Sequence, residues 1–314
     1  MNRIPWQRLV WMAPILLGVS IVAFGLMRAL PGDFIQAAAG TTELTPEARE
    51  TLRRQLGLDE PIWQQYLQWL AAALRGDLGT SFTTQKPVLD ELLPRLVVTA
   101  ELTLVAGLMA LVLGASSGLA AARLRGRTEA GVRLFNSLFL AIPNFVFATL
   151  VVLLAGLYFP EVGIFIYTPF LQDPLAHVVS LLLPGLSLAL AASVTISENT
   201  RAAVLEVASQ DFVMVARAKG LRPGSVLRNY LVRNALTPVI TVTGLQVAAL
   251  LGGSILVEII FTVPGMGQYL FESVTSRNYP AIQAIVLVAA TIVLLVNVAV
   301  DLAYARADAR VRDV

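Results

Sequence analysis

Cysteine is absent from this 314-residue chain, and histidine occurs once, as His177. Without cysteine the chain can form neither a disulfide nor a thiolate metal site, and one histidine cannot build a metal cluster alone. The sequence also lacks the HExxH pattern of zinc peptidases and the GxxxxGKS or GxxxxGKT pattern of nucleotide-binding loops. We therefore expect no metal, no cofactor and no nucleotide hydrolysis in this chain.

Charge is scarce as well. Only 14% of the residues are charged, 56% are hydrophobic, and the mean hydropathy is +0.72. A soluble protein of this length would carry more charge, so the composition indicates an all-α membrane protein. Six apolar runs come near the roughly 20 residues that a helix needs to cross hydrocarbon. These predicted spans are Leu9–Leu30, Thr99–Ala122, Leu134–Leu157, Val178–Glu198, Val239–Phe261 and Ile282–Tyr304.

The runs predict a domain organisation. A tail and first span (1–30) precede an extracytoplasmic segment (31–98), and a transmembrane domain (99–305) then contains a polar loop (199–238) and leads to a tail (306–314). The first run resembles a signal peptide in having Arg3 and Arg8 before it and three alanines, Ala37–Ala39, after it. Its apolar stretch is longer than the 7–15 residues usual there, so we expect it to remain as a span.

Lysine and arginine set the predicted orientation. Arg277 is the only lysine or arginine in the two short outer loops, which are Tyr158–His177 and Thr262–Ala281. By the positive-inside rule both termini are expected in the cytoplasm. Fifteen of the 23 basic residues fall on the predicted cytoplasmic side: Arg3, Arg8, Arg123, Arg125, Arg127, Arg133, Arg201, Arg217, Lys219, Arg222, Arg228, Arg233, Arg306, Arg310 and Arg312.

A basic segment of about thirty residues, Ser209–Pro238, separates two strongly apolar runs. Its size predicts a structured docking surface rather than a simple turn. Ser209 is expected to cap a short helix, with Asp211 in the first turn, where the helix dipole favours negative charge. Gly220 is a natural stop, and Pro223 cannot continue the helix.

Within this predicted helix, residues 209–219, the spacing of Phe212, Val215 and Ala216 predicts one apolar stripe. Arg217 and Lys219 fall in the last turn, where cations suit the dipole. The remaining alternative is a solvated basic loop that only fixes topology.

Several motifs resemble a known family. ARAKGL (Ala216–Leu221) and RNALTP (Arg233–Pro238) are similar to the cytoplasmic "EAA" loop of ABC-importer permeases, closest to the oligopeptide/dipeptide branch. GGSILVEIIFTVPGMGQYL (Gly252–Leu270), RNYPAIQA (Arg277–Ala284) and LLGVSIVAFGLMRALPGD (Leu16–Asp33) resemble other parts of that branch. The resemblance covers nearly the whole chain.

The chain also departs from the family pattern. Met214 and Val215 stand where the general motif has Glu and its first Ala, and Asn278 stands where Asp is usual. The distance from Gly220 to Pro238 is longer than in the general motif.

The resemblance implies six transmembrane helices of the ABC type I importer permease fold, with a largely helical periplasmic insertion after the first span. It implies a non-enzymatic permease subunit that moves di- and oligopeptides across a bacterial or archaeal cytoplasmic (inner) membrane. The implied partners are a second homologous permease, two ATP-binding subunits or domains that hold ATP and Mg, an extracytoplasmic solute-binding protein and the bilayer, but no nucleic acid. The implied coupling-helix residues are Asp211, Phe212, Val215, Ala216, Arg217, Lys219 and Gly220.

Two helices are expected in the segment 31–98. The first has Thr45 as N-cap, Pro46 at its first position, and Gly57 beyond its end. The second, Ile62–Leu74, is amphipathic. Its aromatic residues fit either a belt at the lipid headgroups or a platform for the external binding protein. They are Trp63, Tyr66 and Trp69.

Ionisable groups inside spans are the remaining candidates, since each costs about 2.5–3.5 kcal/mol at mid-helix. Glu258 follows small residues in the fifth span, so it either faces a polar route, pairs with another subunit, or reaches the outer interface. Glu101 and Glu198 lie near span ends, where snorkelling explains them. Pro184 and Pro143 are expected to break their spans. The predicted translocation residues are Gly252, Gly253, Ser254, Glu258 and Asn144.

Glycines inside the spans are interpreted as sites of close helix packing. These are Gly107, Gly114, Gly118, Gly185 and Gly244.

Alternative functions stay open at this point. The same architecture could carry glutathione, a nickel chelate or another small solute. A passive channel or ion-driven transporter would need charged residues that act as relays in mid-span. Glu258 is the only residue in the sequence that suggests such a relay. An intramembrane enzyme would need a nucleophile and base, or metal ligands, at depth.

Overall fold

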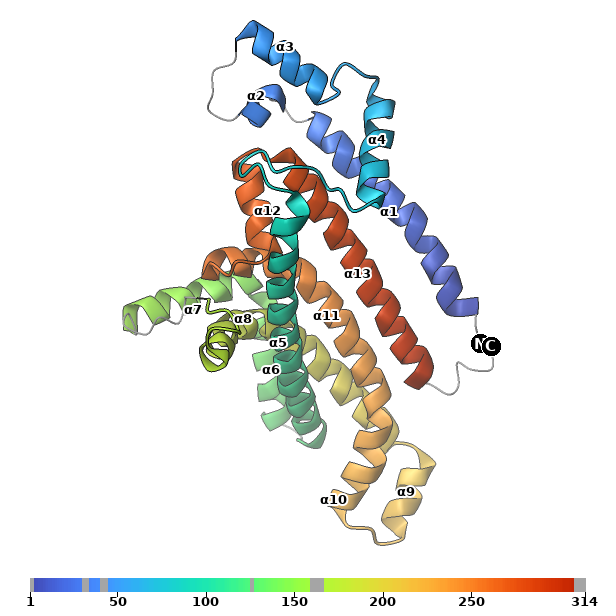
Figure 1. Ribbon diagram of the computed structural model, residues 1–314. Helices are drawn as coiled ribbons and strands as arrows, with labels where there is room; N and C mark the ends of the chain where they lie inside the picture. The colour runs from blue at the N-terminus through green and yellow to red at the C-terminus, as the bar shows by residue number, and fades with distance from the viewer. Residues whose placement is uncertain (1–2, 30–33, 40–44, 125–126, 159–166, 308–314) are drawn as a thin grey trace. The chain divides into compact units, whose positions relative to one another are not determined.

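The computed structural model describes residues 3–29, 34–39, 45–124, 127–158 and 167–307, and within these ranges its long regular elements are all helices (Figure 1). In chain order they are α1 (Arg3–Ala29), α2 (Phe34–Ala39), α3 (Pro46–Gln55), α4 (Ile62–Leu74), α5 (Val88–Arg123), α6 (Arg127–Ala141), α7 (Asn144–Tyr158), α8 (Pro174–Ala208), α9 (Asp211–Ala218), α10 (Pro223–Val226), the π-helix η1 (Leu227–Val232), α11 (Arg233–Phe261), α12 (Met266–Thr275) and α13 (Tyr279–Ala307).

The helices form two compact units. Of the residues that the structure describes, the first contains those within 100–263 and 296–307, and the second contains those within 3–99 and 264–295. The first unit contains α6 to α11 and most of α5, and the second contains α1 to α4, α12 and most of α13, so both units include candidate spans. Each unit is described below by itself.

Five helices of the described chain are long and apolar enough to cross a membrane, and a bent pair makes a sixth candidate. This agrees with an all-α membrane protein of six spans. The five candidate spans are Val10–Arg28, Val88–Arg123, Pro174–Ala208, Pro223–Phe261 and Tyr279–Val300.

The predicted third span, Leu134–Leu157, is not one straight helix. Glu129–Ala141 and Asn144–Tyr158 are bent by 93° at the break before Asn144. Pro143 lies in the break, where it lacks an N–H and disfavours helical geometry in the residue before it. Its carbonyl accepts the first N–H bonds of α7, from Val146 and Phe147. The prediction that this proline breaks the span is confirmed.

The prediction for Pro184 is wrong, because α8 continues through it over 35 residues. One missing N–H does not end a helix whose other turns are intact and packed, and Pro184 is itself buried. One turn later the Ser187 hydroxyl donates to the Leu183 carbonyl at 2.9 Å. The same tolerance is seen at Pro14, Pro94 and Pro238, which all lie inside helices.

Within the first unit, α8 packs against α11, α7 and α6. Glycines of α5 allow a close approach to α8: a Cβ added at Gly114 would lie 2.6 Å from the Ser193 carbonyl oxygen and 2.7 Å from the Ile196 Cβ. A Cβ at Gly118 would clash with the Ser197 carbonyl oxygen. The packing role predicted for these glycines is confirmed. It also holds for Gly107, Gly185 and Gly244, where an added Cβ would come within 2.7 to 3.0 Å of a valine side chain.

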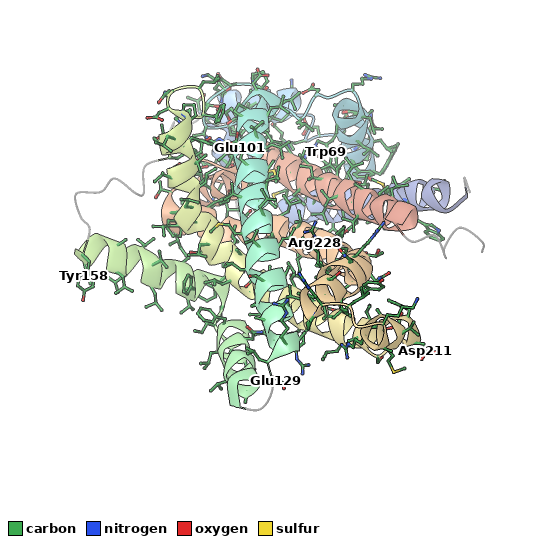
Figure 2. All side chains as sticks on the ribbon, turned by 90° about the horizontal axis from the view of Figure 1, so that it is seen from below. Trp69, Glu101, Glu129, Tyr158, Asp211 and Arg228 are labelled. Atoms are coloured by element: carbon green, nitrogen blue, oxygen red, sulfur yellow. The ribbon has the colours of Figure 1, made fainter. Side chains whose placement is uncertain are left out.

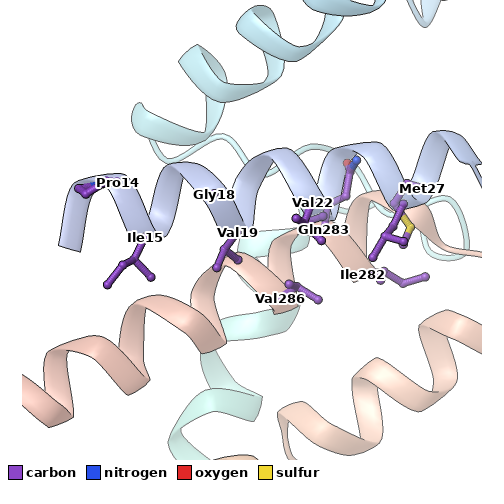
Figure 3. A pocket seen from close by; sticks show the side chains of 11 residues that line it. Pro14, Ile15, Gly18, Val19, Val22, Met27, Ile282, Gln283 and Val286 are labelled. Carbon is purple, nitrogen blue, oxygen red and sulfur yellow. The ribbon is translucent and has the colours of Figure 1, made fainter. Parts of the chain in front are cut away.

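Within the second unit, α4 lies beside α1. The Tyr66 and Ser20 hydroxyls are 2.8 Å apart, and the Phe24 ring contacts both Tyr66 and Trp69. Two of the three predicted belt aromatics therefore pack on the first span, whereas Trp63 is 62% exposed. A cavity of about 330 Å³ runs between α1 and α13, lined almost wholly by apolar residues such as Ile15, Val19 and Val286 (Figure 3).

The start of α3 follows the predicted capping pattern. The Thr45 hydroxyl accepts the Ala48 N–H at 3.3 Å, Pro46 takes the first position, and Gly57 follows with a positive φ of 64°. The helix bounds of α4 agree with the predicted Ile62–Leu74. Both helices of the 31–98 segment are therefore as expected.

Polar contacts tie the loop before α5 and the start of α5 to the region around α12. The Tyr269 hydroxyl donates to Glu91 at 2.8 Å, and Arg95 pairs with Glu272 at 3.1 Å while its guanidinium lies 4.0 Å from the Tyr269 ring centroid. Burial, followed by the hydrogen bond to Glu91, raises the pKa of the Tyr269 phenol. The phenol thus stays protonated as a donor throughout the neutral range.

Candidate functional site: the α9 hairpin

The structure joins α8 to α11 through α9, α10 and η1, and we call residues 209–232 the α9 hairpin (Figure 1). Asp211, labelled in Figure 2, is the first residue of α9 and lies close to the end of α8 in the chain. The residue before it, Gln210, makes no side-chain cap bond. A short helix in this segment was expected, and the structure contains one.

The predicted N-cap at Ser209 is wrong. The Ser209 hydroxyl donates to the Glu206 carbonyl at 2.7 Å, and its backbone N–H also points back to α8. Ser209 therefore ends α8 instead of beginning α9, because α8 continues well beyond the predicted span and brings its last free carbonyls within reach of the hydroxyl.

The end of α9 follows the predicted order with small shifts. The helix stops at Ala218, so Lys219 is the C-terminal cap and not part of the last turn. Gly220 has φ +75°, the left-handed conformation that glycine adopts without strain, and its role as a stop is confirmed. Pro223 does more than end a helix, since it takes the first position of α10, where a missing N–H costs nothing.

The apolar stripe of α9 is placed differently from the prediction. Ala216 is 3% exposed, as expected, but Phe212 is 40% and Val215 52% exposed. The buried partner of Ala216 is Val213, three residues earlier and 0% exposed. The sequence spacing allowed either stripe, and the position of the neighbouring helices decides between them.

The α9 hairpin has a hydrophobic core of its own. An isolated helix of eight residues is not stable in water, so α9 depends on this packing. The core joins α9 to the last turns of α8, the end of α5 and the start of α11, and a displacement of α9 is therefore passed to these helices. The buried members are Ala203, Val204, Val207, Val213, Ala216, Val226, Leu231 and Ala235, with Leu119, Ala122, Ala208, Leu227 and Tyr230 packed against them.

The outward face of α9 mixes apolar and charged side chains. Phe212, Met214 and Val215 are exposed large hydrophobic residues, and the Phe212 ring stacks on Tyr230 with centroids 6.3 Å apart. Asp211 and Lys219 are also exposed. Exposed apolar side chains rimmed by charges are typical of a surface that binds another protein.

A π-helix leads from α10 into α11. It spans Leu227–Val232 and belongs to a class of helix that is rare and is often found at functional positions. Its residues Leu227 and Leu231 face the hairpin core. Propensity patterns cannot separate this element from an α-helix, so sequence reasoning missed it.

The structure brings two of the five predicted translocation residues together. The Ser254 hydroxyl donates to Glu258 Oε1 at 2.9 Å, and Glu258 is 0% exposed in this chain. Gly252 and Gly253 are exposed, and an added Cβ would meet nothing within 4 Å at either. Asn144 lies on another helix, as the first residue of α7. Glu258 is therefore enclosed within the chain, while the two glycines present an open helix surface.

A polar cluster near the start of α8 was not predicted. Glu101, interpreted as a snorkelling residue, has its Oε2 3.6 Å from His177 Nε2 and 3.4 Å from the Tyr167 hydroxyl. The His177 Nδ1 lies 2.8 Å from the Thr168 carbonyl oxygen. The single histidine next to a predicted span end was the one signal for it. In the ranges that the structure describes, no group of three or more potential metal-binding side chains occurs.

Comparisons with known proteins agree with this architecture. Residues 95–313 match the family "Binding-protein-dependent transport system inner membrane component", and residues 1–103 match the N-terminal domain of the same kind of membrane component. Similar chains include a di/tripeptide transport system permease of Pseudomonas aeruginosa (36% identical) and a dipeptide transport system permease of Escherichia coli K12 (34%), each match covering 98% of this chain and 97% of the relative. A putative peptide transport system permease of Brucella abortus is 38% identical over 99% of both chains.

Solved structures show the same fold. A chain of the MetNI methionine ABC transporter, in inward-facing conformations, matches with a TM-score of 0.54 at 18% identity, covering 69% of this chain and 96% of that one. A chain of an amino acid ABC transporter matches with a TM-score of 0.51 at 16% identity, covering 68% and 92%. The family match extends over most of the sequence and the relatives over nearly all of it. The chain therefore belongs to the family of binding-protein-dependent transport system inner membrane components.

Proposed function

We propose that this chain forms one half of the membrane pathway of an ATP-driven importer that carries di- and oligopeptides across the cytoplasmic membrane. As a member of its family it is a permease subunit and not an enzyme, and the family implies ATP-binding subunits and a binding protein as partners. The similar chains described above, which are a dipeptide, a di/tripeptide and a putative peptide transport system permease, support this cargo. The second half would be a similar permease.

The observation that carries the proposal is the α9 hairpin. Its outward face would sit in a cleft of an ATP-binding subunit, with Phe212 and Val215 as apolar contacts and Asp211 and Lys219 as charged ones. Its buried face is fixed to α8, α5 and α11. Movement of the ATP-binding subunits, which would hold ATP and Mg, then rocks these helices between inward-open and outward-open arrangements of similar energy.

Ala216 and Gly220 act in this proposal through the shape of the hairpin. Ala216 packs into the hairpin core, so its small size is needed inside the chain. Gly220 adopts a left-handed conformation and is exposed, so the ATP-binding subunit can come close to the backbone there. Arg217 lies on the flank of the helix, four residues after the buried Val213.

We also propose that Glu258 and Ser254 adjoin the pathway and that Gly252 and Gly253 provide a smooth wall against the second permease. Two exposed glycines on one helix surface allow close approach of a second helix in a membrane. Asn144, at the bend between α6 and α7, is the remaining candidate.

Uptake of labelled di- and tripeptides tests the cargo. Cells lacking the chain should lose uptake, and cells given it back should regain it. Unchanged uptake, with the chain present in the membrane, contradicts peptide cargo and leaves glutathione, nickel chelates or another solute.

The same assay tests the docking role of the hairpin. Gly220→Trp should abolish uptake while the chain still inserts, because a bulky side chain is placed at a left-handed position on the docking surface. Gly220→Asn should retain much of the activity, since asparagine tolerates this conformation. Gly131→Trp, at an exposed glycine of α6 with open space around it, is the matched control. Normal uptake with Gly220→Trp would refute the docking proposal.

A further inference from the structure

A cavity of about 580 Å³ lies on the flank of the α9 hairpin. It is bounded by the end of α5, by α9, by α10 and by η1. The lining residues are Arg123, Arg217, Leu221, Pro223, Gly224, Val226, Leu227 and Leu231.

Two arginine side chains line this cavity, and apolar residues form its floor. Arg123 and Arg217 are its only charged lining residues, and neither side chain has a hydrogen bond or ion pair with the part of the chain that the structure describes. The floor contains Val226 and Leu231, which are 3% and 8% exposed. Like charges that share a cavity favour an anion between them, and the floor favours an apolar group next to that anion.

The cavity lies where membrane headgroups are expected. Arg123 ends α5 one residue after the predicted end of its span, and the preceding Ala122 packs against the hairpin core. Basic pockets at the cytoplasmic ends of spanning helices attract anionic lipid headgroups. Arginine side chains at such ends also extend naturally to the phosphate layer.

The cavity is separate from the surface proposed for the ATP-binding subunit. Arg217 follows the buried Val213 by four residues and so stays on that side of α9, whereas Val215 follows Val213 by two and points to the opposite side. A subunit docked on the outward face therefore leaves this flank open to the membrane.

We propose that the cavity binds an anionic phospholipid of the cytoplasmic leaflet, with its phosphate between Arg123 and Arg217 and the start of an acyl chain over Leu227 and Leu231. The lipid would brace the end of α5 against α9. Because the α9 hairpin depends on packing between these same elements, the membrane would take part in holding the coupling surface in place.

Native mass spectrometry of the purified full-length chain tests this binding. The chain is titrated in detergent with phosphatidylglycerol and with phosphatidylcholine of the same acyl chains. We expect retained phosphatidylglycerol and no comparable retention of phosphatidylcholine. Arg123→Gln with Arg217→Gln should weaken retention about thirtyfold, as expected for two surface cations. Arg222→Gln with Arg228→Gln, an equal loss of charge on the hairpin outside the lining, should leave it unchanged.

Further arms separate the possible occupants. If inorganic phosphate alone displaces phosphatidylglycerol, the site binds free phosphate and not the lipid, and the proposal is overturned. Unchanged lipid retention in the Arg123/Arg217 double variant, with loss of co-purifying ATP-binding subunits, would assign the arginines to a protein partner and also overturn it.

A measurement on the unaltered chain avoids any doubt about folding of the variant. A photoactivatable phosphatidylglycerol should label peptides within residues 217–231. Labelling confined to other parts of the chain would refute the site.

Discussion

Asn278 illustrates how one buried side chain can fix an exposed loop. Its Oδ1 accepts the Phe82 N–H at 2.9 Å and its Nδ2 donates to the Ser81 hydroxyl at 2.8 Å, while Asn278 is 2% and Ser81 0% exposed. The loop before α5 is thus anchored beside the start of α13. The sequence marked this position only as a departure from the family pattern, and its partners lie almost 200 residues away.

Asn278→Ala should lower the free energy of unfolding by about 1–3 kcal/mol, because it removes the acceptor of the Phe82 N–H and the buried amide that donates to the Ser81 hydroxyl. Asn278→Asp should cost less. A carboxylate still accepts from Phe82, and the Ser81 hydroxyl can donate to it. Denaturant unfolding in detergent micelles measures both. Ser276→Ala, on a neighbouring exposed serine, is the control, and an equal loss for all three variants would contradict the anchoring role.

Gly118 gives a second prediction at this scale. Gly118→Val should destabilise the first unit by about 1–3 kcal/mol or prevent stable folding, since an added Cβ would meet the Ser197 carbonyl and the Thr200 side chain. Gly156→Val, on α7 with open space around its added Cβ, should be tolerated. Thermal unfolding of the two variants in detergent compares them. Equal stability would show that α5 and α8 can separate without cost.

At the scale of elements, the short α9 depends on which face it buries. Helix periodicity alone allowed a stripe of Phe212, Val215 and Ala216, and the structure uses Val213 and Ala216. The face is chosen by α8, α10 and η1, so it could not be derived from the α9 segment. Its existence and its stop at Gly220 are local properties, and these were predictable.

Cross-linking follows from the observed face. The chain has no cysteine, so a single Val215→Cys provides a unique thiol on the outward side of α9. In membranes containing the complete importer, a thiol-to-thiol cross-linker should join it to an ATP-binding subunit. Leu205→Cys, which is 41% exposed on α8 but outside the proposed docking face, is the matched control. Equal cross-linking from both positions would contradict docking through the outward face.

For the six spans, composition predicts some properties and leaves others open. Their number and approximate places follow from apolar length alone, because hydrocarbon imposes that length on any helix. Proline effects are harder to derive. Proline separates two helices at Pro143, whereas it lies inside a continuous helix both at the buried Pro184 and at the exposed Pro14, Pro94 and Pro238, so neither the residue type nor its burial decides the outcome.

At the scale of the whole molecule, orientation is the main property that remains a prediction. Thr84→Cys and Ser209→Cys are exposed positions in the predicted outer segment and cytoplasmic loop. A membrane-impermeant maleimide should label Thr84→Cys in intact protoplasts and Ser209→Cys only after permeabilisation. The positive-inside distribution is the physical reason. The reverse pattern would place the α9 hairpin outside and remove the basis of the proposed coupling.

The π-helix η1 also changes the rotation of α10 about the helix axis relative to α11. Its ring closes over one residue more than that of an α-helix, so the side chains after it are turned by about 100° and moved by about 1.5 Å relative to an uninterrupted helix. If one α-helical period is applied without interruption from Pro223 to Val239, the residues on one side of η1 are therefore assigned to the wrong face of the helix. Deleting a single residue within Leu227–Val232 would turn the helix before it by more than a quarter of a revolution, and the apolar side of α10 would rotate away from Val213 without any change in composition.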